Sequence, residues 1–332
     1  MTCRTTRRTT LRALACTLLA AAAPFAGDSA RAADAYPTRP LKFIVNFPPG
    51  GASDTMARIF GQELSAAIGQ PVVIENKTGA GGALGMVYAA KQPADGYTFT
   101  LGTLGSAITQ PLITKTPYDM LRDFMPVSLI ATGPAVLVVN SASPYKSVAE
   151  IVAAAKARPE ALNFGSGGMG TFAHFTGAML NQAAGIQMTH VPYKGGVQAL
   201  NDVLANQLDM IAVDPTSALP QIRNGKLRAL AYTGARRSAL LPDVPTFAES
   251  GFKDLVGANS WSIWMPAGVP ENVSAVFQKA LAKAMENPGL KARFLELGAE
   301  PMHTSPEELR RFVASETARY AKIVKEQNIK PE

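Results

Sequence analysis

Cysteine is almost absent from this sequence of 332 residues, and histidine is scarce. The two cysteines, Cys3 and Cys16, both lie within the first 32 residues, so a chain without that segment has no thiol for a disulfide or a metal ion. Neither the three histidines nor the carboxylates form a pair with the spacing of metal ligands. We therefore predict a protein that holds no metal and no cofactor.

Long apolar runs and basic runs are also missing beyond residue 32. No later apolar stretch reaches 18 residues, which predicts no second membrane segment. The formal charge of +7 arises mostly at the amino terminus, where five arginines stand against one aspartate. Residues 33–332 carry 27 basic and 24 acidic side chains without a basic cluster, so nucleic acid is not an expected partner.

Residues 1–32 have the pattern of an export signal peptide. A basic start is followed by an apolar stretch over 11–26, which is short for a bilayer span, and then by the small-x-small sequence Ala30-Arg31-Ala32. We predict that this segment is removed and that the protein resides in the periplasm. Residues 6–12 approach a twin-arginine motif but have Thr10 where phenylalanine is usual, so both export routes stay open.

Strand-like and helix-like segments alternate along the rest of the chain. Residues 42–47 are rich in β-formers, and residues 55–68 place apolar side chains at helical spacing. Further on, Ser147 and Glu150 form a capping box at the start of a predicted helix. Near the end, a strand over 260–265 and three helices are expected. Strands separated by helices of this length predict an α/β fold with a parallel sheet covered on both faces.

Two α/β units of this size indicate two lobes. The chain crosses between them near Gly133-Pro134 and near 233–237, where two connecting strands would act as hinges. The first lobe is then discontinuous and comprises residues 36–133 plus 234–332, and the second comprises residues 134–233.

Glycine is concentrated in loops that directly follow predicted strands. Ligands of open α/β sheets bind beyond the carboxyl ends of the strands, and glycine there lets the backbone approach a ligand closely. Most of these loops also open a helix, whose free N–H groups and dipole attract an anion. Four such loops could converge on one carboxylate without any arginine, although each glycine could instead serve only a tight turn. The loops are residues 48–54, 78–82, 102–106 and 165–171.

Three charged residues near these loops have two interpretations each. Asp54 either satisfies backbone donors at a helix start or faces a ligand amine or hydroxyl. Asp214 ends a strand before a proline, where it either faces the ligand or caps a turn. Lys194 is either a surface charge or a long-range attractor for an anion.

Enzymatic motifs are present only in part. Residues 165–170 match the G-x-G-x-x-G dinucleotide pattern, but the next strand ends without an acidic residue for a ribose hydroxyl. A G-x-S-x-G nucleophile elbow is absent around Ser166, although a set of Ser166, His174 and Asp214 can be imagined. We predict that the protein is not an enzyme. An exported hydrolase that uses Ser166 or Ser106, and an exported cofactor-dependent oxidoreductase, stay as alternatives.

A set of sequence segments spread over nearly the whole chain carries a family resemblance. Together they resemble the Bug-type receptors, the extracytoplasmic solute-binding components associated with tripartite tricarboxylate transporters. Any one segment alone would not be specific. The segments are FPPGGASD at 47–54, VVIENKTGAGG at 72–82, PADGYTFTLG at 93–102, VPYKGG at 191–196, GKLRALAYTGARRSALLPDVPTFAESG at 225–251 and PAGVP at 266–270.

The resemblance implies a type II periplasmic-binding-protein fold, in which two α/β lobes close on a ligand carboxylate held largely by backbone amides and water. The partners would be a small carboxylate and either membrane transporter subunits or a sensor, and we expect a monomer. Residues 46–49 read Asn-Phe-Pro-Pro where relatives often have Pro-Phe/Tyr-Ala-Ala, which should alter the first loop. The ligand-binding residues carried over by position are Pro49, Gly50, Gly51, Ser53, Asp54, Gly81, Gly82, Ala83, Thr103, Ser106, Ser166, Thr171, His174 and Asp214.

Overall fold

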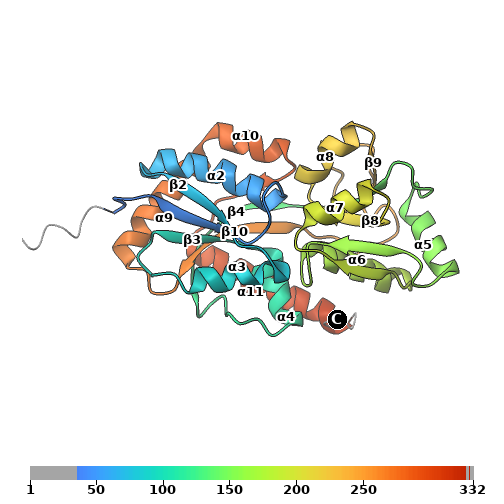
Figure 1. Ribbon diagram of the computed structural model, residues 1–332, viewed down its shortest axis with the longest axis horizontal. Coiled ribbons are helices and arrows are strands. Elements are labelled where there is room, and N and C mark those ends of the chain that lie inside the picture. The colour runs from blue at the N-terminus through green and yellow to red at the C-terminus, as the bar shows by residue number, and fades with distance from the viewer. Residues whose placement is uncertain (1–35, 327–328, 330–332) are drawn as a thin grey trace, which may run out of the picture. The chain divides into compact units, whose positions relative to one another are not determined.

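The structure is a computed structural model that describes residues 36–326 and residue 329. The predicted export signal lies outside the described residues. The described residues from Arg39 onward belong to one compact unit, which contains two β-sheets with helices on their faces (Figure 1). None of the helices in the described part of the chain combines the length and apolar character that a bilayer span requires.

The first sheet has six strands in the order β11-β4-β10-β3-β1-β2. β1 pairs in parallel with β2 and β3, whereas β10 runs antiparallel to both β3 and β4. The prediction of a parallel sheet is therefore wrong for three of the five strand pairings, because β10 enters between β3 and β4 in the opposite direction and β11 is antiparallel to β4. The strands are β1 Leu41–Val45, β2 Val72–Asn76, β3 Thr98–Thr103, β4 Phe124–Gly133, β10 Asn259–Pro266 and β11 Glu300–Pro301.

The second sheet has five strands in the order β7-β6-β8-β5-β9. β6 is parallel to β7 and β8, and β5 is antiparallel to β8 and β9. The strands that follow the two crossings, β5 and β10, are both antiparallel to their neighbours in the sheet. The strands are β5 Val136–Asn140, β6 Asn163–Ser166, β7 Thr189–Pro192, β8 Met210–Val213 and β9 Leu227–Tyr232.

Helices cover both faces of the first sheet. On one face the ring of Phe43 stacks on Phe99, with 4.4 Å between ring centroids, and these two rings contact Phe60 of α2 and Phe277 of α9. All four rings are fully buried, and each such ring stabilises the fold by about 1.5–3 kcal/mol. α3 lies on the opposite face (Figure 1). The helices here are α2 Ala52–Ile68, α3 Ala83–Ala90, α4 Gln110–Ile113, α9 Glu271–Glu286, α10 Pro288–Glu296 and α11 Pro306–Glu326.

The second sheet is covered in the same way, because successive side chains of a strand point to opposite faces. Leu137 and Ala212 pack in one apolar cluster with Phe175 of α6. Val136 and Ile211, their neighbours along the strands, pack in the other cluster with residues of α7 and α8. The helices here are α5 Val148–Ala157, α6 Phe172–Ala184, α7 Gly196–Leu204 and α8 Pro215–Arg223.

Two chain segments connect the sheets. The first joins β4 to β5 through residues 134–135, and the second leads from β9 to β10. Thr233 ties them together, because its Oγ1 accepts a hydrogen bond from the Ala135 amide at 2.8 Å and donates to the Gly257 carbonyl at 2.8 Å. Residues 245–247 still run beside β9, which favours a second crossing close to β10. The predicted lobe boundaries stay a prediction.

Candidate ligand-binding site

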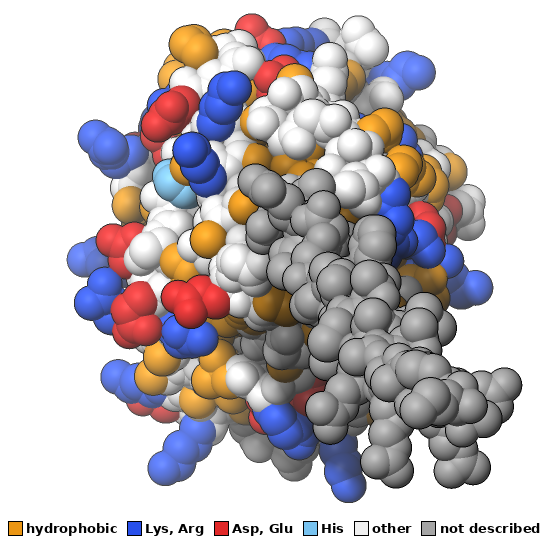
Figure 2. All heavy atoms as spheres, turned by 90° about the vertical axis from the view of Figure 1, so that its left-hand side faces the viewer, with side chains coloured by type: hydrophobic (Ala, Val, Ile, Leu, Met, Phe, Trp, Pro, Cys, Tyr) orange, Lys and Arg blue, Asp and Glu red, His pale blue; other side chains and the backbone are white. Residues whose placement is uncertain are grey.

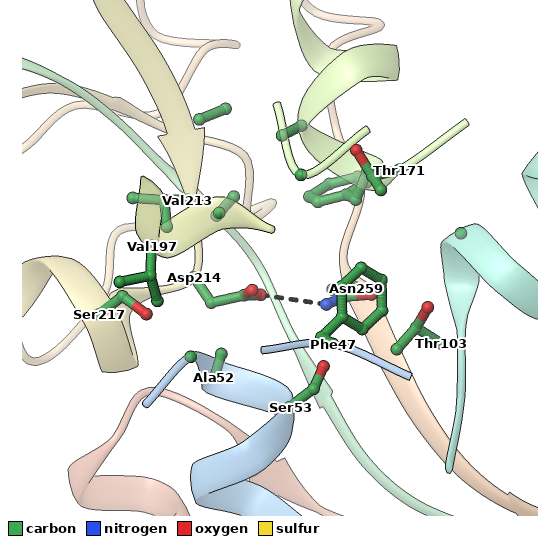
Figure 3. A pocket seen from close by; sticks show the side chains of 18 of the residues that line it. Phe47, Ala52, Ser53, Thr103, Thr171, Val197, Val213, Asp214, Ser217 and Asn259 are labelled. Carbon is green, nitrogen blue, oxygen red and sulfur yellow. Dashed lines mark hydrogen bonds between the residues drawn. The ribbon is translucent and has the colours of Figure 1, made fainter. Parts of the chain in front are cut away.

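A pocket of about 90 Å³ lies where loops from the two sheets meet (Figure 3). Its volume is several times the space that one buried water needs, so it can hold a small molecule. The first sheet and its loops contribute Phe47, Pro48, Gly51, Ala52, Ser53, Thr103, Gly105 and Asn259. The second sheet, its loops and the first crossing contribute Ala135, Gly167, Thr171, Phe172, Ala173, Gly196, Val197, Ile211, Ala212, Val213, Asp214 and Ser217.

Four helices begin at this pocket. The first residues of α2, α6 and α7 line it, and so does the residue that precedes α8. At the start of each helix the preceding residue makes no side-chain hydrogen bond to the helix; these residues are Gly51, Thr171, Gly195 and Asp214. The first backbone N–H groups of a helix have no partner within the helix, and the helix dipole makes them attractive to an anion.

The pocket lining contains no lysine, arginine or histidine, and its only ionisable side chain is Asp214. Asp214 Oδ1 accepts a hydrogen bond from Asn259 Nδ2 at 3.3 Å, and Figure 3 shows the two side chains pointing toward one another across the cavity. Burial raises the pKa of Asp214 to about 6. An anion in this pocket would therefore be held by backbone and hydroxyl groups, with no cationic side chain beside it.

Three hydroxyl groups belong to the polar lining of the pocket, and hydrogen bonds to neighbouring residues hold each of them in position. Ser53 Oγ accepts a hydrogen bond from Trp261 Nε1 at 3.2 Å, which leaves its own proton for the pocket. Thr103 Oγ1 accepts from the Ser106 amide at 3.2 Å and lies 3.2 Å from Ser106 Oγ. Thr171 Oγ1 donates to the Gly168 carbonyl at 2.7 Å and so leaves the start of α6 uncapped.

The structure brings together five of the residues that the sequence predicted. Gly51, Ser53, Thr103, Thr171 and Asp214 all line the pocket. Three of the four glycine-rich loops, at 48–54, 102–106 and 165–171, therefore meet at the pocket, whereas no residue of the loop at 78–82 lines it. A ligand contact for each of them stays a prediction, because it depends on the bound state.

Asp54, Ser106 and Ser166 lie outside the pocket lining. Asp54 is buried, and its carboxylate accepts hydrogen bonds from the Gly50 amide, Arg58 and Asn76, which lower its pKa despite burial. Ser106 is fully buried, and its hydroxyl accepts from the Thr103 amide. These groups shape the loops behind the pocket.

Ser166 is likewise fully buried and holds the fourth loop in place. Its hydroxyl lies 2.7 Å from His190 Nε2 and bonds with both the amide and the carbonyl of Gly168. His174 Nδ1 accepts from the Gly170 amide at 3.2 Å. The hydroxyl of Ser166 thus pairs with His190, not with the His174 and Asp214 of the imagined set. Pro49, Gly50, Gly82 and His174 also lie outside the pocket lining.

A second cavity of about 740 Å³ lies beside the pocket and shares no lining residue with it. Gly81 and Ala83, two of the predicted residues, line this cavity. So does Lys194, whose side chain is exposed to solvent. The surface interpretation of Lys194 therefore fits its position, because the lysine is not part of the pocket lining.

Loops from the two sheets are in direct backbone contact at Gly81. This residue has φ +60°, and a Cβ added to it would lie 2.5 Å from the carbonyl oxygen of Met169. A Cβ added to Gly168 would lie 2.9 Å from the Gly81 nitrogen. Only glycine allows this approach, so the observed arrangement is one in which the two sets of loops are closed upon each other.

Several lining residues were not predicted from the sequence. Phe47 and Val197 have apolar side chains, and no sequence motif marks them as residues of a binding site. Asn259 stands at the start of β10, and its position beside Asp214 depends on where that strand enters the first sheet. Ser217, in the first turn of α8, could have been found from its place after the strand end at Asp214.

Two sheets joined by two crossings, with a pocket between their loops, form the fold of a periplasmic binding protein. The structure is similar to that of the periplasmic binding protein BugD, with a TM-score of 0.85 and 31% identity over 90% of this chain and 100% of that one. It is equally similar to R. palustris Rpa4515 with adipate, with a TM-score of 0.86 and 33% identity over 90% of this chain and 100% of that one.

Sequence relatives agree with the structural ones. Protein BugT of Bordetella pertussis (strain Tohama I) is 35% identical over 300 residues, which cover 90% of this chain and 92% of that protein. Residues 56–329 match the tripartite tricarboxylate transporter family receptor, and the chain belongs to this family. The resemblance predicted from the sequence is thus confirmed, and the chain is a solute-binding receptor with a two-lobed fold.

Proposed function

We propose that this receptor captures a small carboxylate in the pocket at the starts of α2, α6, α7 and α8 and delivers it to the membrane subunits of a tripartite tricarboxylate-type transporter. One observation carries the proposal. Four helix starts without side-chain caps surround a pocket whose lining has no cationic side chain. Backbone N–H groups at helix starts suit an anion, and a carboxylate offers several lone pairs to accept from them.

The related protein solved with adipate supports the carboxylate part of the proposal. The groups proposed to hold the carboxylate are the amides that follow Gly51 and Thr171 and the hydroxyls of Ser53 and Thr103, because the Thr171 hydroxyl donates its proton to the Gly168 carbonyl. The buried residues behind them, such as Asp54 and Ser106, would act by fixing the loops.

The ligand would be bound and released unchanged. The serines suggested for a hydrolase, Ser106 and Ser166, are fully buried and lie outside the pocket lining, which favours binding over turnover.

We also infer that residues 1–32 direct export and are then removed, and that the receptor acts as a monomer. Figure 2 shows a face on which, where it is drawn in colour, basic and acidic side chains are mixed.

Isothermal titration calorimetry with matched probes tests the proposal. Adipate and a panel of small mono- and dicarboxylic acids would be titrated into the receptor alongside the amide analogue of each acid. An acid should bind while its amide, which has the same shape but no charge, should bind at least about 100-fold more weakly. Equal binding of acid and amide would contradict the anion pocket. An acid that is chemically converted during long incubation, with conversion lost in Ser166→Ala, would favour the hydrolase instead.

The export inference has its own test. Mass spectrometry of protein recovered from the periplasm should show an amino terminus between Ala33 and Tyr36. An intact Met1 on periplasmic protein would contradict it.

A further inference from the structure

Asp214 is the one charged side chain in the pocket lining, and apart from its own backbone N–H its carboxylate has Asn259 as its partner among the described residues. It precedes α8 but does not cap that helix through its side chain. The residue that follows is Pro215, which has no backbone N–H to donate. The long Asn259 contact of 3.3 Å leaves most of the acceptor capacity of the carboxylate directed into the cavity.

A carboxylate in this pocket needs a hydrogen-bond donor. Buried charges and acceptors are costly unless they are hydrogen-bonded, and the lining holds no cation to pair with Asp214. The positive end of α8 favours the ionised form, and a pKa of about 6 leaves Asp214 mostly ionised at neutral pH. Because Asp214 already places a negative charge at the start of α8, a ligand carboxylate belongs at the starts of α2 and α6 instead.

We propose that Asp214 and Asn259 form a subsite for a hydrogen-bond donor of the ligand, so that the receptor selects carboxylates that also carry an ammonium or hydroxyl group over plain dicarboxylates. The subsite rests on the proposed function, because it assumes a carboxylate at the neighbouring helix starts. An N–H or O–H group would complete the hydrogen bonding of Asp214, whereas a second carboxylate would meet a like charge there.

Acids with one carbon skeleton and different substituents test the subsite. The C4 set is aspartate, malate and succinate, and the C5 set is glutamate, 2-hydroxyglutarate and glutarate. Calorimetry at pH 7.5, on receptor freed of co-purified ligand, should show a donor-bearing acid binding at least about tenfold more tightly than the plain acid of the same length. The tighter of the ammonium and hydroxyl acids identifies the donor.

Asp214→Asn tests whether this residue causes the preference. The variant keeps the shape and the contact with Asn259 but loses the charge, so the advantage of the donor-bearing acid should fall to about threefold or less. Binding of the plain acid should stay equal or improve. Asp243→Asn is the matched control, because Asp243 is an exposed aspartate outside the pocket lining and should leave the preference unchanged.

The outcomes separate the subsite from the proposed function. A wild-type receptor that binds the plain acid as tightly as its donor-bearing partners overturns the subsite and leaves the carboxylate pocket standing. An Asp214→Asn variant that melts normally but weakens all acids equally also overturns it, because Asp214 would then only build the pocket. If no acid of the two sets or of the wider panel binds the wild type, the proposed function itself fails.

Discussion

Helix starts at the pocket differ from those of α5, α10 and α11, although α3 and α4 also begin without a side-chain cap. α5, α10 and α11 begin behind Ser147, Asn287 and Ser305, whose side chains accept hydrogen bonds from backbone N–H groups two or three residues further on. At the pocket, Gly51 has no side chain to offer, and Thr171 turns its hydroxyl to a loop carbonyl instead. α9 also lacks a cap, but it follows Pro270 at an exposed position, where water can serve its first N–H groups.

The difference indicates where the fold keeps donors free for a ligand. A capping side chain stabilises a helix start by about 1 kcal/mol, and four helices at the pocket do without it. Their N–H groups are therefore available to an anion. Substitutions that restore a cap or hold the loops apart should therefore weaken carboxylate binding. Substitutions of charged residues outside the pocket should change the affinity little.

The largest effect is expected from Thr171→Asp. Thr171 has an extended backbone, with φ −70° and ψ 161°, so an aspartate there can cap α6 and place its own carboxylate at the helix start. Carboxylate binding measured by calorimetry should weaken at least 100-fold, because the site is filled and a like charge is added. Thr171→Asn can cap in the same way without the charge and should weaken binding less. Equal losses in the two variants would show that charge plays no part.

A loss of at least about tenfold is expected from Gly81→Ala. The new Cβ would stand 2.5 Å from the Met169 carbonyl oxygen and should keep the two sets of loops apart. Ligand-induced compaction, measured by small-angle X-ray scattering, should decrease along with the affinity.

Gly50→Ala provides the matched control for this substitution. Gly50 also has a positive φ, +80°, but an added Cβ would meet no atom within 4 Å. Both substitutions introduce a similar backbone strain, yet only Gly81→Ala opposes loop contact. If the two variants bind equally well, contact between the loops is not needed for binding.

A smaller effect, on stability, is expected from Asp214→Asn. The pKa of Asp214, about 6 in the folded protein, lies above the ordinary value of 3.8, so the folded state binds the proton more tightly than the unfolded state. The ligand-free receptor should therefore lose stability as pH rises from about 4 to about 6, by roughly 3 kcal/mol at most. Asp214→Asn should remove this loss and raise the melting temperature at pH 7.5 by about 5 °C. A variant that melts lower than the wild type at pH 7.5 would contradict a costly charge at this position.

The smallest effect is expected from Lys194→Ala. Lys194 is exposed and lines the second cavity, not the pocket. Removing it should change carboxylate affinity by about threefold or less, or roughly 0.6 kcal/mol. Calorimetry in low and moderate salt checks this result. A loss of tenfold or more in both would place the anion beside this lysine and away from the helix starts.

Much of the fold could be predicted from local sequence. The predicted strands at 42–47 and 260–265 and the predicted helix at 55–68 correspond to β1, β10 and α2 to within three residues, and the capping box of Ser147 and Glu150 is present as expected. The antiparallel entry of β10 could not be predicted, because strand order depends on pairing between distant segments. The π-helical turn at Gly105–Thr109 also has no local pattern.

The site was predictable where glycine marks a loop after a strand. Gly51 and Thr171 could be found in this way, since both precede a helix that follows such a loop. Asn259 could not, because its place beside Asp214 is set by the register of β10 against β4. Asp54 was predicted because it lies in the first glycine-rich loop. Its carboxylate instead accepts hydrogen bonds from Arg58 and other groups behind the pocket. The direction in which a side chain points has no signal in the local sequence.

A crystal structure of the receptor with its tightest-binding acid tests the central claim most directly. The account predicts carboxylate oxygens within about 2.7–3.2 Å of backbone nitrogens at the starts of α2 and α6, or linked to them through one water. It also predicts that no lysine, arginine or histidine side chain contacts the carboxylate. A carboxylate paired with a cationic side chain, or bound in the cavity beside Lys194, would contradict it.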